Sequence, residues 1–285
     1  MNLAAIQARE TKPPRGASFA LFLLSGLFLF ELEFFASSGG SRNFQIATFV
    51  GLPLLFSIVA LLVRRNPRFL PYWPALFSYS LVSISLFSMW LLDSWPARLG
   101  LGPKSPQGMA LTKASDAVIL LLIVVVLAKV FRVSLSSLYL QKGRLRLGLV
   151  IGIAGFATMA TFGMLEAQSM GISMARVIAW APWILLFVLA NGFFEELMFR
   201  GLFLKKFEPL VGPRLANLLT ALVFAIGHAG VKYTADILTF TAITFVFALV
   251  WGYMMQKTES LWGSMLFHAG ADTVIIIGIL AGVKI

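Results

Sequence analysis

The sequence contains no cysteine and few charged residues. The absence of cysteine from 285 residues excludes disulfide bonds, cysteine nucleophiles and thiolate metal ligands. Charged residues make up 12% of the chain, against about 25% in ordinary soluble domains. Hydrophobic residues make up 59%, and the mean hydropathy is +0.88. Because so few charges cannot cover so much apolar surface in water, the composition indicates an integral membrane protein.

Long apolar runs account for most of the chain. A membrane-spanning helix needs about 20 mostly apolar residues, and no stretch is β-rich with the period of two expected in an outer-membrane barrel. We therefore expect an all-α fold, a polytopic transmembrane helical bundle with about 8–9 spans. The nine candidate runs lie near residues 17–36, 44–63, 70–92, 115–131, 147–168, 177–200, 214–230, 236–256 and 261–282.

Basic residues outnumber acidic ones, 23 to 12. In a soluble protein the net charge of +11 would suggest nucleic-acid binding. Here the basic residues lie in short loops beside the apolar runs, where they set orientation, so no nucleic-acid partner is expected. With the N-terminus inside, the inner segments hold 16 Lys and Arg and the outer segments hold 7. This bias predicts a multi-pass protein of the plasma (inner) membrane with a cytoplasmic N-terminus.

The first run could be either a signal peptide or a membrane span. Arg9, Lys12 and Arg15 precede it and small residues follow it, as in a cleaved signal peptide. Its apolar stretch is long, however, and Glu31 and Glu33 interrupt its end. We therefore favour an uncleaved first span, with both acids at the membrane interface.

The two halves of the chain differ in their ionisable residues. Residues 1–146 form N-terminal transmembrane helices of unassigned role, and Asp116, near a span end, is interpreted as interfacial. Residues 147–285 hold both histidines and most of the intramembrane acids. A charge at mid-span costs about 2.5–3.5 kcal/mol, so such a group indicates function. The candidates are Glu195, Glu196, Arg200, His228, His268 and Asp272.

The sixth and seventh runs place an acid opposite a histidine. Glu196 and Arg200 are four residues apart on a helix and can form an ion pair. Glu195 lies about 100° round the helix and has no local partner. A Pro- and Gly-containing turn lies midway between Glu195 and His228. An antiparallel pair of helices joined there places Glu195 and His228 at similar heights.

The last run places His268 and Asp272 four residues apart on one helical face. Two kinds of chemistry are compatible with these residues. A carboxylate beside an imidazole can activate water directly. Alternatively, two histidines and one carboxylate, here Glu195, His228 and His268, can bind zinc and leave a fourth position for water. A serine nucleophile is not favoured, because Ser264 lacks the Gly-x-Ser-x-Gly context.

Three motifs in order resemble the signature of the CPBP family, which includes the type II CAAX prenyl endopeptidases and the bacterial Abi proteins. The motifs lie in residues 180–275, and residues 147–285 would form the catalytic core. The three motifs are Glu195-Glu196-x-x-x-Arg200, Phe224-x-x-x-His228 and His268-x-x-x-Asp272.

The resemblance implies an intramembrane endopeptidase with an all-helical fold, working with or without a metal such as zinc. Glu195 would be the water-activating base and His228 its partner. His268 and Asp272 would form the oxyanion side or complete a metal site. Support would come from Glu196, Arg200 and Phe224. The prenyl endopeptidases often have Asn where this chain has Asp272, and an ionised Asp cannot donate a hydrogen bond to an oxyanion. Asp272 would then bind a metal, orient His268 or be protonated.

Three functions follow from these observations. The first is an endopeptidase that cleaves a membrane-associated protein or peptide near the cytoplasmic face. The second is a non-catalytic membrane scaffold or immunity factor that keeps the family fold. The third is a proton-coupled transporter that uses the same acids as a relay, against which the lack of an internal repeat argues.

Overall fold

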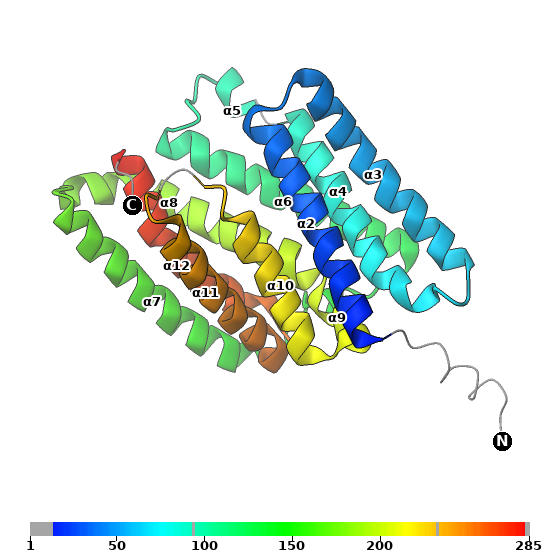
Figure 1. Ribbon diagram of the computed structural model, residues 1–285. Helices are drawn as coiled ribbons and strands as arrows, with labels where there is room; N and C mark the ends of the chain where they lie inside the picture. The colour runs from blue at the N-terminus through cyan, green and yellow to red at the C-terminus, as the bar shows by residue number, and fades with distance from the viewer. Residues whose placement is uncertain (1–13, 93–94, 232–233, 283–285) are drawn as a thin grey trace.

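The computed structural model describes residues 14–92, 95–231 and 234–282, and within these residues every regular element is a helix (Figure 1). The predicted all-α fold is therefore confirmed. The longer helices are α2 (Arg15–Gly39), α3 (Arg42–Arg65), α4 (Trp73–Leu92), α6 (Pro106–Phe131), α7 (Leu145–Ser169), α8 (Met174–Glu195), α10 (Pro213–Gly227), α11 (Ile237–Thr258) and α12 (Leu261–Ala281). The short elements are η1 (Leu70–Tyr72), α5 (Trp95–Arg98), η2 (Leu135–Leu138), η3 (Glu196–Gly201) and α9 (Leu204–Val211).

Eight helical segments in the described part of the chain are long and apolar enough to cross a membrane. The predicted run 214–230 differs from the other eight, because α10 has only 15 residues. At 1.5 Å per residue α10 is about 22 Å long, less than the ~30 Å of the hydrocarbon core. The seventh run is thus a short helix that ends at Gly227, and His228 is its C-cap residue.

The helix predicted from residue 115 begins nine residues earlier, at Pro106. The hydroxyl of Ser105 caps it by accepting a hydrogen bond from the backbone N–H of Gly108, at 3.0 Å. Proline fits the first helical position, where no backbone donor is needed. The longer helix brings Lys113 into this candidate span and moves Asp116 from the start of the predicted run into the interior of the helix.

The helices of the two halves pack into one bundle. Figure 1 shows α2, α3 and α4 on one flank and α7, α11 and α12 on the other, and α10 contacts both α2 and α11. A single cluster of buried apolar side chains runs from Phe22 in α2 to Ala271 in α12. The first predicted run is therefore part of the core, while Arg9 and Lys12 before it lie outside the described residues.

Several connecting segments meet at one end of the bundle, which we call the basic end. The backbone N–H of Arg144 donates to the carbonyl of Thr258 at 2.6 Å, and that of Leu261 donates to the carbonyl of Tyr139 at 3.1 Å. The ammonium of Lys206 donates to the hydroxyl of Ser137 at 2.5 Å. These connections are among those that the charge bias assigns to the inner side. At the opposite end α2 leads into α3, and α6, α8 and α11 begin.

Glycines allow α7 and α12 to approach closely, as small residues do between membrane helices. A Cβ atom at Gly152 would lie 2.6 Å from the carbonyl oxygen of Gly263, and that backbone atom cannot rotate away. We expect Gly152→Ala to destabilise the protein by about 1–3 kcal/mol, because the two helices must separate. Thermal unfolding in detergent measures the effect.

The matched control for this prediction is Gly51→Ala in α3. A Cβ at Gly51 would have no neighbour within 4 Å. Since alanine favours helix over glycine by roughly 0.5–1 kcal/mol, this variant should be at least as stable as the parent. Equal unfolding temperatures for the two variants would contradict close packing of α7 on α12.

Candidate active site

The end of α8 places two neighbouring glutamates in different surroundings. Glu195 is the last residue of α8, and Glu196 opens the π-helical turn η3. Such turns occur often at functional sites. Glu195 lines two cavities, whereas Glu196 is fully buried. The side chains of Glu195 and Glu196 therefore point in different directions, as the angle of about 100° between neighbouring helical residues predicted.

Glu196 holds three partners in the buried part of the site. Its Oε1 lies 2.6 Å from Nη1 of Arg200, so the predicted ion pair is formed, with both side chains fully buried. The same oxygen lies 2.9 Å from Nδ1 of His268. Its Oε2 accepts a hydrogen bond from the hydroxyl of Ser264 at 2.5 Å. Glu196 thus joins η3 to α12, and Ser264 serves in this network.

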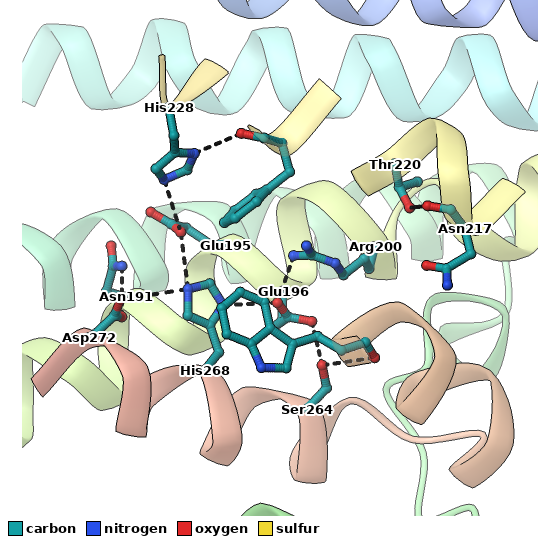
Figure 2. Close-up of polar contacts among 12 residues, drawn as sticks. Asn191, Glu195, Glu196, Arg200, Asn217, Thr220, His228, Ser264, His268 and Asp272 are labelled. Carbon is teal, nitrogen blue, oxygen red and sulfur yellow. Dashed lines mark hydrogen bonds and ion pairs between the residues drawn. The ribbon is translucent and has the colours of Figure 1, made fainter. Parts of the chain in front are cut away.

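Glu195 lies between the two histidines (Figure 2). Its Oε2 is 3.8 Å from Nε2 of His228 and 3.4 Å from Nε2 of His268. The Nδ1 atom of His228 lies 2.8 Å from the carbonyl oxygen of Phe224, which can only accept a hydrogen bond. We therefore assign the proton of neutral His228 to Nδ1, which leaves the lone pair of Nε2 facing Glu195.

Aromatic rings enclose these groups. The predicted support residue Phe224 packs against the rings of His228 and His268, with centroid separations of 4.3 and 5.7 Å. The guanidinium of Arg200 also lies over Phe224, 4.4 Å from its centroid. The ring of Trp251 stacks on His268 at 3.9 Å. The rings hold the imidazole of His268 in a fixed plane beside Glu195.

Asp272 and Asn191 complete the polar cluster. Asp272 Oδ1 lies 3.6 Å from Nε2 of His268, and its Oδ2 accepts a hydrogen bond from the amide of Asn191 at 3.0 Å. The structure therefore brings together all four predicted catalytic residues. Asn191 was missed by the sequence analysis, although it lies four residues before Glu195 on the same helix.

Two cavities meet at Glu195. The apolar cavity, about 440 Å³, lies among α8, α11 and α12, and its wall includes Phe187, Ile243 and Phe247. The polar cavity, about 620 Å³, lies among α2, α3, α4, α6 and α8. Three side chains line both cavities: Lys113, Glu195 and His228.

The polar cavity brings residues of the N-terminal half to the site. Glu33 and Asp116, interpreted above as interfacial, line this cavity together with Glu195. Lys113 was also missed, because the predicted run began after it; its ammonium lies 5.1 Å from the ring centroid of Phe194. The only feature of the sequence that could have indicated a role for Lys113 is its position just before an apolar run.

The predicted zinc ligands Glu195, His228 and His268 come together, with the carboxylate of Glu195 facing an Nε2 atom of each histidine. A tetrahedral zinc with bonds of about 2.0 Å holds its ligand atoms ~3.3 Å apart. The carboxylate oxygen of Glu195 is 3.4 Å from one Nε2 and 3.8 Å from the other. Among the residues that the structure describes, no group of three or more His, Asp or Glu side chains could hold a metal ion. Zinc at this site remains a prediction.

Comparison with known families supports the motif assignment. Residues 177–274 match the family model described as type II CAAX prenyl endopeptidase Rce1-like. The matched segment includes every residue of the three motifs, which confirms the resemblance over about a third of the chain. No curated protein and no solved structure gave a match.

Proposed function

We propose that this multi-pass membrane protein is an intramembrane endopeptidase of the CAAX type that hydrolyses a peptide bond of a membrane-associated protein. One observation carries the proposal. The carboxylate of Glu195 faces the Nε2 atoms of both histidines where two cavities meet, in a segment that matches a CAAX endopeptidase model. A general base, its imidazole partner and room for a substrate are thereby combined.

Hydrolysis begins when Glu195 removes a proton from a water molecule. The water oxygen bonds to the carbonyl carbon of the substrate, and the carbonyl oxygen becomes an oxyanion. When the C–N bond breaks, the leaving nitrogen takes the proton from Glu195, and the products are a carboxylic acid and an amine. His228, held by the carbonyl of Phe224, orients the water beside Glu195.

Stabilisation of the oxyanion falls to the His268 side of the site. His268 is held by Glu196 on one ring nitrogen and faces Asp272 with the other. Of the three roles considered for Asp272, orientation of His268 fits its contacts with His268 and Asn191 best. Groups fixed in this way before reaction stabilise a developing charge without reorganisation, and burial strengthens the effect.

The substrate can be identified by comparing protein termini in membranes of the native host. Strains that carry the parent protein or Glu195→Gln are grown to matched protein levels, and new N- and C-termini are mapped. A membrane protein whose processed terminus disappears in the variant supports proteolysis and identifies a substrate. Identical termini in both strains would contradict the proposal and favour a non-catalytic scaffold.

The metal content of the protein tests the alternative mechanism, in which Glu195, His228 and His268 bind zinc. Because Glu195 acts in this mechanism as the base and not as a zinc ligand, we expect purified protein to carry less than one equivalent of zinc and to keep its activity after treatment with a chelator. Elemental analysis of the protein measures this directly. One equivalent of zinc that is lost in His228→Ala would instead establish the predicted zinc ligands.

A further inference from the structure

The polar cavity is built mainly by helices outside the matched segment 177–274. α2, α3, α4 and α6 contribute most of its wall. The charged side chains that these helices contribute to the wall are of both signs: Glu33, Arg42, Lys113 and Asp116. Ionisable groups are costly inside a membrane, and those that line a cavity, as these four do, are stabilised when the cavity contains water. The composition of the wall therefore indicates that the cavity contains water.

The cavity reaches the end of the bundle opposite the basic end. Its wall includes the exposed residues Ser37, near the end of α2, and Arg42, the first residue of α3. Gln45 lies one turn further into the cavity, and its amide donates to the carbonyl of Gly40. Glu33 lies deeper along α2 and accepts a hydrogen bond from Ser37 at 2.8 Å. Polar side chains therefore extend from the α2–α3 connection to Glu195.

The apolar cavity on the other side of Glu195 has a different character. Apart from the side chains of the site and Lys113, its wall is mostly aromatic and aliphatic. This surface suits the membrane-embedded part of a substrate but offers little to solvate water or charge. Hydrolysis consumes water and creates a new carboxylate and a new ammonium. Moving either charge through an apolar environment is strongly unfavourable.

We propose that the polar cavity is the aqueous passage of the enzyme, through which water reaches Glu195 and the hydrophilic peptide product leaves at the end opposite the basic end. Lys113 and His228 stand where the passage meets the site. The inference rests on the proposed endopeptidase function. With the N-terminus inside, the passage opens on the outer face, whereas the charge pattern and the motifs predicted cleavage near the cytoplasmic face.

The absence of cysteine makes the passage directly testable. Single cysteines are introduced by Gln45→Cys and Glu33→Cys in the cavity. The matched control is Ile46→Cys, since Ile46 is 43% exposed, is adjacent to Gln45 in α3 and does not line the cavity. Ser134→Cys, in the exposed loop between α6 and α7, marks the basic end. The probe is a sulfonated, membrane-impermeant thiol reagent applied to sealed right-side-out and inverted vesicles.

We expect Gln45→Cys and Glu33→Cys to react about tenfold or more faster than Ile46→Cys, because only a cysteine in contact with water forms the reactive thiolate. Both should react from the face opposite the one that labels Ser134→Cys. Denaturation in SDS gives the total thiol for each variant, and Ser37→Cys provides a second rim position if Gln45→Cys does not fold.

Three results would overturn the passage. In the first, both cavity cysteines react no faster than Ile46→Cys. In the second, they react from the same face as Ser134→Cys. In the third, the cysteine at the rim (Gln45→Cys or Ser37→Cys) reacts but Glu33→Cys does not. Labelling needs no turnover, so it can be repeated in a Glu195→Gln background. If the protein proves not to be a protease, the labelling pattern is still expected. Failure of the proposed function can therefore be distinguished from failure of the proposed passage.

Discussion

Glu195→Gln is expected to reduce proteolysis by about 10²–10⁴-fold or more, because the amide cannot accept the proton of the attacking water. The side chain keeps its size and still fits between His228 and His268. The Oε2 atom of Glu195 is buried without a hydrogen-bond partner among the described residues. Since burying a charged carboxylate is unfavourable, the variant should be at least as stable as the parent. Cleavage of an identified substrate and thermal unfolding measure the two effects.

The control for this prediction is Glu166→Gln near the end of α7. It makes the same chemical change outside both cavities. The control should leave cleavage unaltered, so that the loss in Glu195→Gln belongs to the site. Normal turnover by a folded Glu195→Gln protein would exclude Glu195 as the base. An unfolded Glu195→Gln protein would instead make Glu195 a structural residue.

The second large effect is expected for the buried ion pair of Glu196 and Arg200. Arg200→Met removes the guanidinium from the fully buried carboxylate of Glu196, which keeps only its contacts with Ser264 and His268. Breaking such a pair from one side costs about 3–5 kcal/mol. Cleavage should fall as well, because Glu196 also holds Nδ1 of His268. Unfolding in detergent, with parent and variant at equal concentration, measures the loss of stability.

Two further variants test the reason for that loss. The double variant Glu196→Gln with Arg200→Met removes both charges and should regain much of the stability, since no unpaired charge remains buried. Lys205→Met breaks the partly exposed pair of Lys205 with Glu259 at the basic end. That change should cost about 0–1 kcal/mol. A double variant as unstable as Arg200→Met alone would show that packing of the arginine, and not charge, dominates.

The sequence was sufficient to predict the features that lie within one helix or across one turn between neighbouring helices. Composition alone determined the membrane class, and helical spacing predicted the pairing of Glu196 with Arg200. The turn between Glu195 and His228 predicted that the two would face each other, and their atoms lie 3.8 Å apart. The motifs and their order resemble those of the CAAX endopeptidases, and a family model of that type matches residues 177–274. The two residue pairings needed only the helical repeat and the chain connection.

Contacts between distant helices were decided by the tertiary structure. The packing of α6 on α8, and of α2 on α9 and α10, placed Lys113 and Glu33 in the wall of a cavity that Glu195 also lines, which the sequences of α2 and α6 do not indicate. The early end of α10 at Gly227 and the π turn after Glu195 set the direction of the site's side chains. Helix rotation and crossing depend on the packing of apolar faces, which the apolar run of a membrane helix leaves open. The sequence by itself therefore determined which polar groups the site contains, while the packing of the helices decided how they are arranged and which side chains surround them.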